Sequence, residues 1–119
     1  MAARTDLKDL LTRHHEISIS VTGRKSGRII SIPVWFVFEA GKLYLLPVQG
    51  TRTQWYKNVQ KKPSIQIAVG DTVAEVKVVP ITDATQVASV VEKFRANYGT
   101  NNVKKYYSKF DVALVADIS

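Results

Sequence analysis

Apolar and polar residues alternate along six stretches of this chain. A period of two is typical of strands that bury one face and expose the other. The alternation covers residues 17–22, 30–38, 43–48, 65–69, 72–79 and 112–118. Ala40-Gly41 and Gly70-Asp71 are short hairpin signals between neighbouring stretches. Because proline cannot donate to a strand ladder, we expect an edge, bulge or bend at Pro33 and Pro47, and the end of a strand before Pro80.

Helical spacing of apolar residues predicts a short helix at the N-terminus, over residues 5–14 of the segment 1–14. Thr51 and Gln54 have the spacing of a capping box, so a second short helix is expected to follow Thr51. Gly50 precedes this cap and leaves the helix end approachable. Its free N–H groups are therefore candidates to receive an anion.

Two further helices are expected in the C-terminal third. The first is capped by Thr82 or Asp83 and ends at residues 97–99, and the second covers residues 101–109. Six antiparallel strands with few helices favour a small barrel over a parallel sheet, because the helical crossovers that parallel strands need are missing.

The size and composition indicate one ordinary globular domain over residues 1–119, with 45% hydrophobic content. The absence of cysteine excludes disulfides, thiolate catalysis and cysteine-bound zinc. No apolar run reaches the ~18 residues of a membrane span, and the polar N-terminus lacks the apolar core of a signal peptide. We therefore expect a cytoplasmic protein.

Positive charge is concentrated in the first part of the chain. Residues 17–70 contain eight basic residues and one acidic residue, an excess equal to the net charge of +7 for the whole chain. Such an excess indicates an anionic partner: a charged cofactor, a nucleic acid or an acidic surface. A solubilising surface is the alternative, and it suits Lys57, Lys61 and Lys62.

A basic turn lies between the first two predicted strands. Gly23 and Gly27 allow tight backbone conformations, so that N–H groups can converge. Between them, Arg24, Lys25 and Ser26 add two cations and a hydroxyl donor. These groups suit the binding of phosphate or carboxylate oxygens.

Side chains for nucleophilic or metal-based catalysis are scarce. His14 and His15 stand together at the end of the first predicted helix, where they point in different directions and a solvated helix end accounts for them. We therefore expect no metal site. An enzyme built on this chain would need a bound cofactor to supply the reactive atom.

Aromatic residues are candidates to wall a flat conjugated ligand, although each is also suited to filling the core or an interface. They are Trp35, Trp55, Tyr56, Tyr98, Tyr106 and Tyr107.

Two motifs together resemble the deazaflavin-dependent nitroreductase family. They are T-G-R-K-S-G-x-x-x-x-x-P at residues 22–33 and, after a hairpin, W-Y-x-N-x-x-x-x-P at residues 55–63. Members of this family are split-barrel flavin and deazaflavin oxidoreductases related to pyridoxamine-phosphate oxidase. The order of elements matches over residues 15–118.

The resemblance implies a mainly β fold with short helices, a six-stranded antiparallel split β-barrel of the FMN-binding kind. It implies a homodimer with the cofactor at the interface, and coenzyme F420 (a deazaflavin) or alternatively FMN as that cofactor. Haem-like tetrapyrroles stay open as ligands. The implied activity is hydride transfer to a small organic acceptor such as a quinone or nitro compound.

The resemblance also implies which residues act. Asn58 would fix the loop. Tyr98, Tyr106 and Tyr107 fall in the region that flanks the substrate pocket, and each is a candidate donor to the acceptor. The implied cofactor contacts are Arg24, Lys25, Ser26, Arg28, Val48, Gln49, Gly50, Thr51 and Trp55.

Two alternatives accompany the reductase hypothesis. A non-catalytic flavin- or deazaflavin-binding or carrier protein on the same scaffold would bind cofactor without turnover. A nucleic-acid-binding barrel is suggested by the net charge and the aromatic residues, but no pair of aromatics at alternate positions of one strand forms a stacking platform. We therefore expect no nucleic-acid partner.

Overall fold

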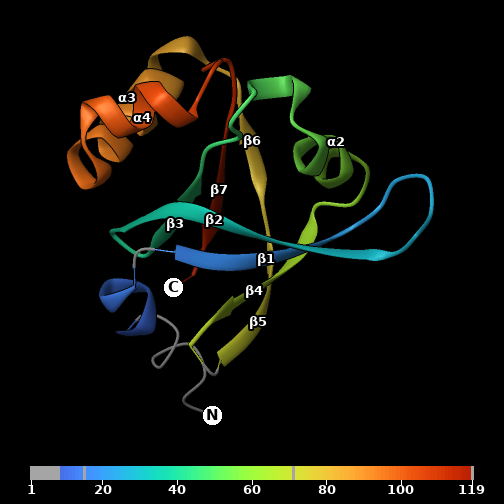
Figure 1. Cartoon of the computed structure of the whole chain (residues 1–119). Helices are drawn as coiled ribbons and strands as arrows, with labels where there is room; N and C mark the ends of the chain where they lie inside the picture. Colours follow the sequence, from blue (N-terminus) through green and yellow to red (C-terminus); the bar gives the residue numbers. More distant parts are fainter. Residues whose placement is uncertain (1–8, 15, 71, 119) are drawn as a thin grey trace.

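Seven strands run through the part of the chain that the structure, a computed structural model, describes: residues 9–14, 16–70 and 72–118. The strands are β1 (Glu16–Thr22), β2 (Ile29–Glu39), β3 (Lys42–Leu45), β4 (Ser64–Val69), β5 (Thr72–Lys77), β6 (Val79–Ile81) and β7 (Ala113–Asp117). They form one sheet in the spatial order β5-β4-β1-β2-β3-β7-β6 (Figure 1), and each neighbouring pair is antiparallel.

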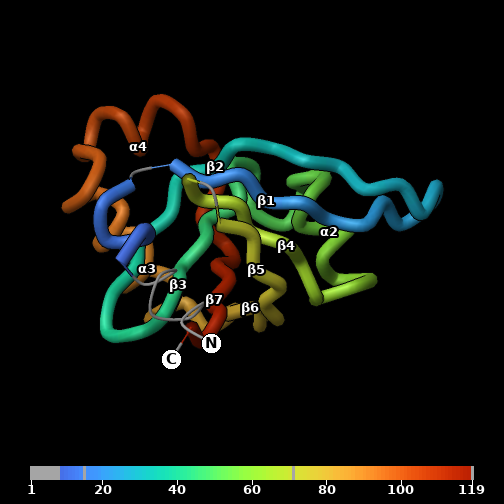
Figure 2. Tube along the Cα trace, turned by 90° about the horizontal axis from the view of Figure 1, so that it is seen from below, coloured from blue at the N-terminus to red at the C-terminus, as the bar shows by residue number. Residues whose placement is uncertain are grey.

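The two edges of this sheet belong to one continuous stretch of chain. β5 pairs with β4 at one edge and β6 pairs with β7 at the other, yet a single residue, Val78, separates β5 from β6. The sheet therefore curls until its edges meet at this bend (Figure 2). When the bent strand is counted once, six antiparallel strands make the barrel. This confirms the predicted mainly β split-barrel class.

Prolines set two strand limits differently from the prediction. The strand expected over residues 72–79 ends at Lys77, and Pro80, expected to lie after it, is inside the next strand, β6, where it pairs with Leu114. Pro80 is tolerated because an edge strand needs ladder donors on one side only. β3 ends at Leu45, three residues earlier than predicted, and Pro47 follows in a segment that leaves the sheet.

The alternating apolar residues of β1 and β4 point into the barrel. All of them are almost fully buried: Ile17, Ile19, Val21, Ile65, Ile67 and Val69. The alternation in the sequence therefore identified the buried face of both strands correctly.

Four short helical elements cover the barrel: η1 (Gly50–Arg52), α2 (Gln54–Lys61), α3 (Ala84–Tyr98) and α4 (Thr100–Tyr106). The Asp83 carboxylate caps α3 by accepting from the Gln86 N–H at 3.0 Å, as one of the two predicted caps. Residues 9–13 are the described part of the predicted N-terminal helix. Residues 5–8 of that helix, together with His15 and Asp71, lie outside the described residues.

The hairpin between β1 and β2 projects from the barrel and carries the basic turn at its tip (Figure 1). β2 is longer than its neighbours: residues 29–35 pair with β1, and residues 36–39 pair with β3. Within the described part of the chain, no strand pairs with the second edge of residues 29–35. This free edge, which contains Pro33, borders the candidate site.

Candidate functional site

A pocket of about 440 Å³ lies along the free edge of β2. Four consecutive β2 residues line it, from Ile32 to Trp35, so the pocket borders the edge of the strand and not one face alone. Opposite this edge stand residues of the segment after β3, of α2 and of the end of α4, with one acidic residue at the start of β1. These residues are Leu46, Val48, Trp55, Tyr106, Tyr107 and Glu16.

The basic turn forms a second hollow, which it shares with α2. Arg24 docks the turn on the helix: its backbone N–H and Nη1 both donate to the Asn58 Oδ1, at 3.1 and 2.8 Å, and its Nη2 donates to the Gln54 Oε1 at 2.9 Å. Asn58 therefore fixes the loop, as predicted. Because both acceptors are neutral amides, they leave the positive charge of Arg24 uncompensated.

The other residues of the turn are open to solvent. Lys25 and Ser26 are exposed and line the second hollow. The Ser26 hydroxyl accepts from the Arg28 N–H at 3.2 Å, which stabilises the turn. Two cations and a hydroxyl thus gather at one end of the free edge.

One row of side chains connects the two hollows. Ile30 lines the hollow at the turn, and Ile32 and Val34, on the same face of β2, line the pocket. At a rise of about 3.3 Å per residue, Ile30 and Val34 are roughly 13 Å apart along the strand. Across from this row, Gln54 and Trp55 follow each other on α2 and belong to one hollow each. The two hollows together suit an elongated ligand with a ring at one end and an anion at the other.

The predicted capping box does not form. α2 begins after Thr53, and the Thr53 hydroxyl accepts from the Gln49 N–H at 2.8 Å. Thr51 lies in η1, and its hydroxyl donates to Asp111 at 2.8 Å and accepts no helix N–H as a capping residue would. A charged carboxylate is a stronger acceptor than a neutral amide, so Asp111 accepts the Thr51 N–H that the Gln54 side chain would have accepted in a capping box.

The anion-binding site predicted at Thr51 does not form either. The N–H groups of residues 49–53 all have acceptors within the chain: Thr53 Oγ1, Pro47 O, Asp111 Oδ1, Gln49 O and Gly50 O. Gly50 itself is buried against Asp111. These amides are therefore not free to receive an anion from outside.

The sequence-predicted cofactor residues thus separate into two groups. The two hollows bring together Arg24, Lys25, Ser26, Val48 and Trp55. Neither hollow is lined by Arg28, Gln49, Gly50 or Thr51.

The three candidate tyrosines differ in what they can do. The Tyr98 hydroxyl is bound to the backbone of Phe36, accepting from its N–H at 3.2 Å and donating to its carbonyl at 2.7 Å. Its ring stacks on Trp35, with centroids 4.4 Å apart. Tyr98 therefore positions Trp35 and does not line the pocket.

Tyr106 and Tyr107 do line it. Tyr107 is only 6% exposed, and burial, with a smaller contribution from Tyr98, raises the pKa of its hydroxyl. Tyr106 is 53% exposed, so its hydroxyl is the most accessible of the three.

Two pocket residues had no sequence signal. Glu16 precedes the strand predicted over residues 17–22 and is the first residue of β1, and nothing in the neighbouring sequence indicates that it borders a pocket. Leu46 had been assigned to a strand. Both positions depend on where β3 ends and on how β1 pairs with β2.

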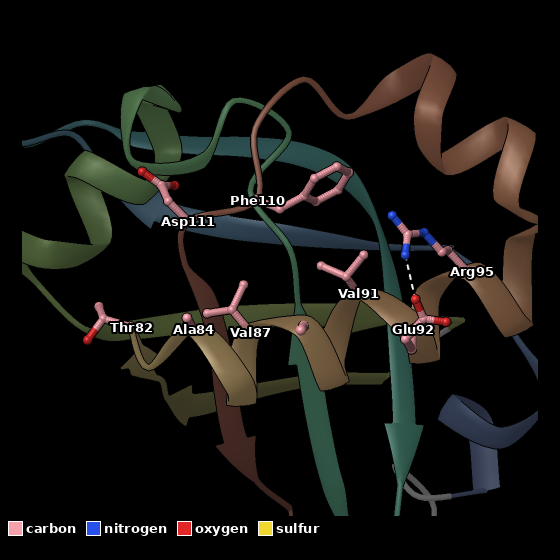
Figure 3. A pocket seen from close by; sticks show the side chains of 9 residues that line it. Thr82, Ala84, Val87, Val91, Glu92, Arg95, Phe110 and Asp111 are labelled. Carbon is pink, nitrogen blue, oxygen red and sulfur yellow. Dashed lines mark hydrogen bonds and ion pairs between the residues drawn. The ribbon is translucent and has the colours of Figure 1, made fainter.

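A different cavity of about 450 Å³ lies between α3 and Phe110 (Figure 3). Its cation, Arg95, is paired with Glu92 and lies 5.9 Å from the centre of the Phe110 ring. Because that charge is already compensated, this cavity is a poorer anion site than the turn.

Two kinds of site are absent from the part of the chain that the structure describes. No helix there is long and apolar enough to cross a membrane. No group of three or more potential metal-ligating side chains was found in residues 9–14, 16–70 and 72–118.

Solved structures with the same fold include a reductase and a binding protein. A structure described as the F420-H2 dependent reductase FDR-A has 18% identity and a TM-score of 0.66, covering 87% of this chain and 94% of that one. HutZ, described as a heme storage protein from Vibrio cholerae, has 11% identity and a TM-score of 0.71, covering 98% of this chain and 89% of that one.

A third structure, described as a domain-swapped dimer, has 17% identity and a TM-score of 0.67, covering 95% of each chain. These likenesses confirm the predicted fold, which this chain shares with an F420-H2 dependent reductase and a heme storage protein. No curated protein matches the sequence. A family model described as "Uncharacterized protein conserved in bacteria (DUF2255)" matches residues 7–113.

Proposed function

The chain belongs to the family DUF2255, and from this premise we propose that it is an oxidoreductase with a flavin-type cofactor, coenzyme F420 or FMN. The proposed reaction transfers hydride to a small organic acceptor such as a quinone or nitro compound. The likeness in fold to an F420-H2 dependent reductase supports this class of reaction. A cytoplasmic location stays a prediction.

The observation that carries the proposal is the connection between the cationic turn and the aromatic pocket. Arg24 and Lys25 supply positive charge at one end, and the row from Ile30 to Val34 leads to the pocket beside Trp55. Flavin-type cofactors combine a flat ring with an anionic tail, so the residues present fit both of their parts.

Each end of the site has a specific task. Lys25, Arg24 and the Ser26 hydroxyl would bind the anionic tail by charge-assisted hydrogen bonds. Ile32, Val34 and Trp55 would hold the ring by apolar contact and keep water away from it. The unpaired backbone groups of the β2 edge would donate to and accept from the rim of the ring.

The acceptor would lie on the open side of the ring, towards Tyr106. When bound in its reduced form, a deazaflavin supplies hydride from its C5 atom. The exposed Tyr106 hydroxyl would donate a hydrogen bond to an acceptor oxygen on which negative charge develops.

A homodimer that covers the cofactor is part of the proposal. Apolar side chains stay exposed around the two hollows: Ile30 is 42% and Val48 39% exposed, in addition to Tyr106. A second copy would bury this surface, and the domain-swapped dimer of the same fold supports such an arrangement. Sedimentation analysis with and without cofactor tests it: a monomer in both conditions would contradict the dimer.

The function is tested by titrating the purified full chain with F420 and with FMN while the absorption spectrum is recorded. We expect saturable binding and a spectral shift with one of them. The reduced complex should then be oxidised by a quinone or a nitroaromatic under anaerobic conditions. Absence of binding with both cofactors would overturn the proposal.

A non-catalytic carrier is the second candidate, and it is favoured by the small number of candidate tyrosine hydroxyls that an acceptor can reach. Of the three candidate tyrosine hydroxyls, that of Tyr98 is bound to the backbone and that of Tyr107 is buried, which leaves Tyr106 as the accessible donor. The fold is also that of a protein described as storing heme. A carrier would bind cofactor tightly and show no oxidation with any acceptor of the panel.

A further inference from the structure

The two hollows along the free edge of β2 carry opposite charges. Arg24 and Lys25 stand at the turn, whereas Glu16 is the one charged residue among those that line the aromatic pocket. We propose that the Glu16 end of the pocket binds a cationic group of an aromatic ligand. If the chain is a reductase, that ligand is the hydride acceptor, and this part of the inference rests on the proposed function.

The position of Glu16 is set by the pairing of the first two strands. Glu16 lies directly opposite Trp35 in the β1–β2 register. Ile32 is the β2 residue of the pocket that lies nearest the turn, and Trp35 is the one farthest from it. Glu16 therefore lies at the end of the pocket that is far from the turn. A ligand whose anion is held at the turn brings its opposite end towards Glu16.

The wall beside Glu16 is aromatic and held firmly in place. Trp35 stacks on Tyr98 in nearly parallel planes, 2° apart, and the edge of Tyr106 meets Trp35 with centroids 5.4 Å apart. Tyr107 lies 6.0 Å from Trp35. Four aromatic rings, those of Trp35, Trp55, Tyr106 and Tyr107, thus border one pocket with a carboxylate.

This combination of groups favours a cation for a physical reason. The faces of aromatic rings carry negative potential, so a cation within about 6 Å of a ring is attracted, and a carboxylate adds to that attraction. An anion meets repulsion from both. Tyr106 already makes one such contact, since Lys105 Nζ lies 5.3 Å from its ring centroid, so the attraction by Glu16 and the other rings has to outweigh this neighbouring cation.

The test uses three benzyl compounds of similar size: benzyltrimethylammonium, benzyl alcohol and benzoate. Both tryptophans of the chain line this pocket, so intrinsic fluorescence reports on its occupancy without any cofactor. We expect the cation to bind about tenfold more tightly than benzoate, with the alcohol between them. Equal affinities, or tighter binding of benzoate, would overturn the inference.

Variants separate the local charge from the overall charge. Glu16→Gln should reduce the preference for the cation to about twofold. Glu75→Gln changes the net charge by the same amount at an exposed position of β5 that does not line this pocket. It should leave the preference unchanged. A loss of preference in both variants would mean that net charge decides, and would contradict the role of Glu16. Circular dichroism spectra check that the variants fold.

Two outcomes keep this inference distinct from the proposed function. If neither F420 nor FMN binds but the cation preference depends on Glu16, the pocket chemistry holds and the reductase proposal fails. If cofactor binds and is oxidised but cationic, neutral and anionic nitroaromatics react equally well, the reductase proposal holds and this inference fails. A dimer that dissociates in Glu16→Gln would assign Glu16 to the interface and also refute it.

Discussion

Asp111 caps the η1 turn through Thr51: its Oδ1 accepts from the Thr51 N–H at 2.9 Å, and its Oδ2 accepts from the Thr51 hydroxyl at 2.8 Å. Nearby, the Ser108 N–H donates to the Val48 carbonyl at 2.8 Å. These bonds join the segment after β3 to the segment after α4. Val48 and Tyr107 line the pocket from these two segments, so the contact between Asp111 and Thr51 joins the segments that carry two of its lining residues.

Replacing Asp111 by asparagine should lower the free energy of unfolding by about 1–2 kcal/mol, since a charge-assisted pair of bonds is weakened at a partly exposed site. Urea unfolding at pH 7 measures the effect. Asp9→Asn is the control, because the Asp9–Arg13 pair is on the surface and contributes little. An Asp111 variant as stable as the Asp9 variant would contradict the structural role.

The same carboxylate predicts a pH dependence. Partial burial alone would raise the pKa of Asp111, but the Thr51 hydroxyl, the Thr51 N–H and Lys109 outweigh it, so the pKa is lowered overall. Stability from this group is therefore fully present above the unfolded pKa of about 3.9 and is lost as the pH falls through the lower folded value. The stability difference between the natural protein and Asp111→Asn should shrink below about pH 4. A difference that grows on acidification would be the wrong sign.

Two glycines with left-handed backbone offer a matched comparison. A Cβ at Gly50 (φ +57°) would lie 2.1 Å from the Asp111 Oδ1, whereas a Cβ at Gly27 (φ +72°) would meet nothing within 4 Å. Gly27→Ala should cost about 1–2 kcal/mol from backbone strain alone. Gly50→Ala should cost at least ~1 kcal/mol more, because it also displaces Asp111. Thermal melting of both variants measures this, and similar losses would argue against the close approach of Asp111.

The bonds of Tyr98 to Phe36 predict a structural effect of removing one hydroxyl. Tyr98→Phe should lower the free energy of unfolding by about 1–2 kcal/mol, since both backbone groups of Phe36 lose a partner. Tyr106→Phe removes an exposed hydroxyl and should stay within ~0.5 kcal/mol of the natural protein. A larger loss of stability in Tyr106→Phe than in Tyr98→Phe, measured by urea unfolding, would contradict the structural role of the Tyr98 hydroxyl.

The two cations of the turn should respond differently to truncation. Lys25→Ala should weaken FMN binding about tenfold and leave the binding of riboflavin, which lacks the phosphate, unchanged. Arg24→Ala should in addition lower stability by about 1 kcal/mol, because the turn loses its side-chain bonds to Asn58 and Gln54. Calorimetric titration of both ligands, with Lys61→Ala as a surface control, measures these effects. Equal weakening of FMN and riboflavin would remove the turn from the phosphate site.

Local signals in the sequence were sufficient for most of the fold. Alternation identified the buried faces of β1 and β4, and the Asp83 cap and the apolar stripe predicted α3. The glycine-bracketed turn was located by its residues alone. These features depend on contacts within a strand or a helix, so a short stretch of sequence contains the information that they need.

The candidate site was predictable only where it depends on such local features. The turn and Trp55 line the two hollows, and their binding of a cofactor stays a prediction, whereas the capping box at Thr51 was wrong. Thr51 binds Asp111 and not Gln54, and Asp111 is 60 positions away in the chain. A hydrogen bond to a charged acceptor that the fold brings within reach is more stabilising than the local capping hydrogen bond that the sequence favours.

The sequence by itself therefore determined a small antiparallel barrel with a cationic turn, because strand periodicity and turn chemistry act between near neighbours. Three features were decided only by the tertiary structure. Asp111 accepts the donors of Thr51 at the predicted anion site, the Tyr98 hydroxyl binds the backbone of Phe36, and Glu16 borders the aromatic pocket. Each of these contacts depends on which distant segments the closure of the barrel brings together. The function of a buried hydroxyl or of a carboxylate is therefore set by partners that lie far away in the sequence.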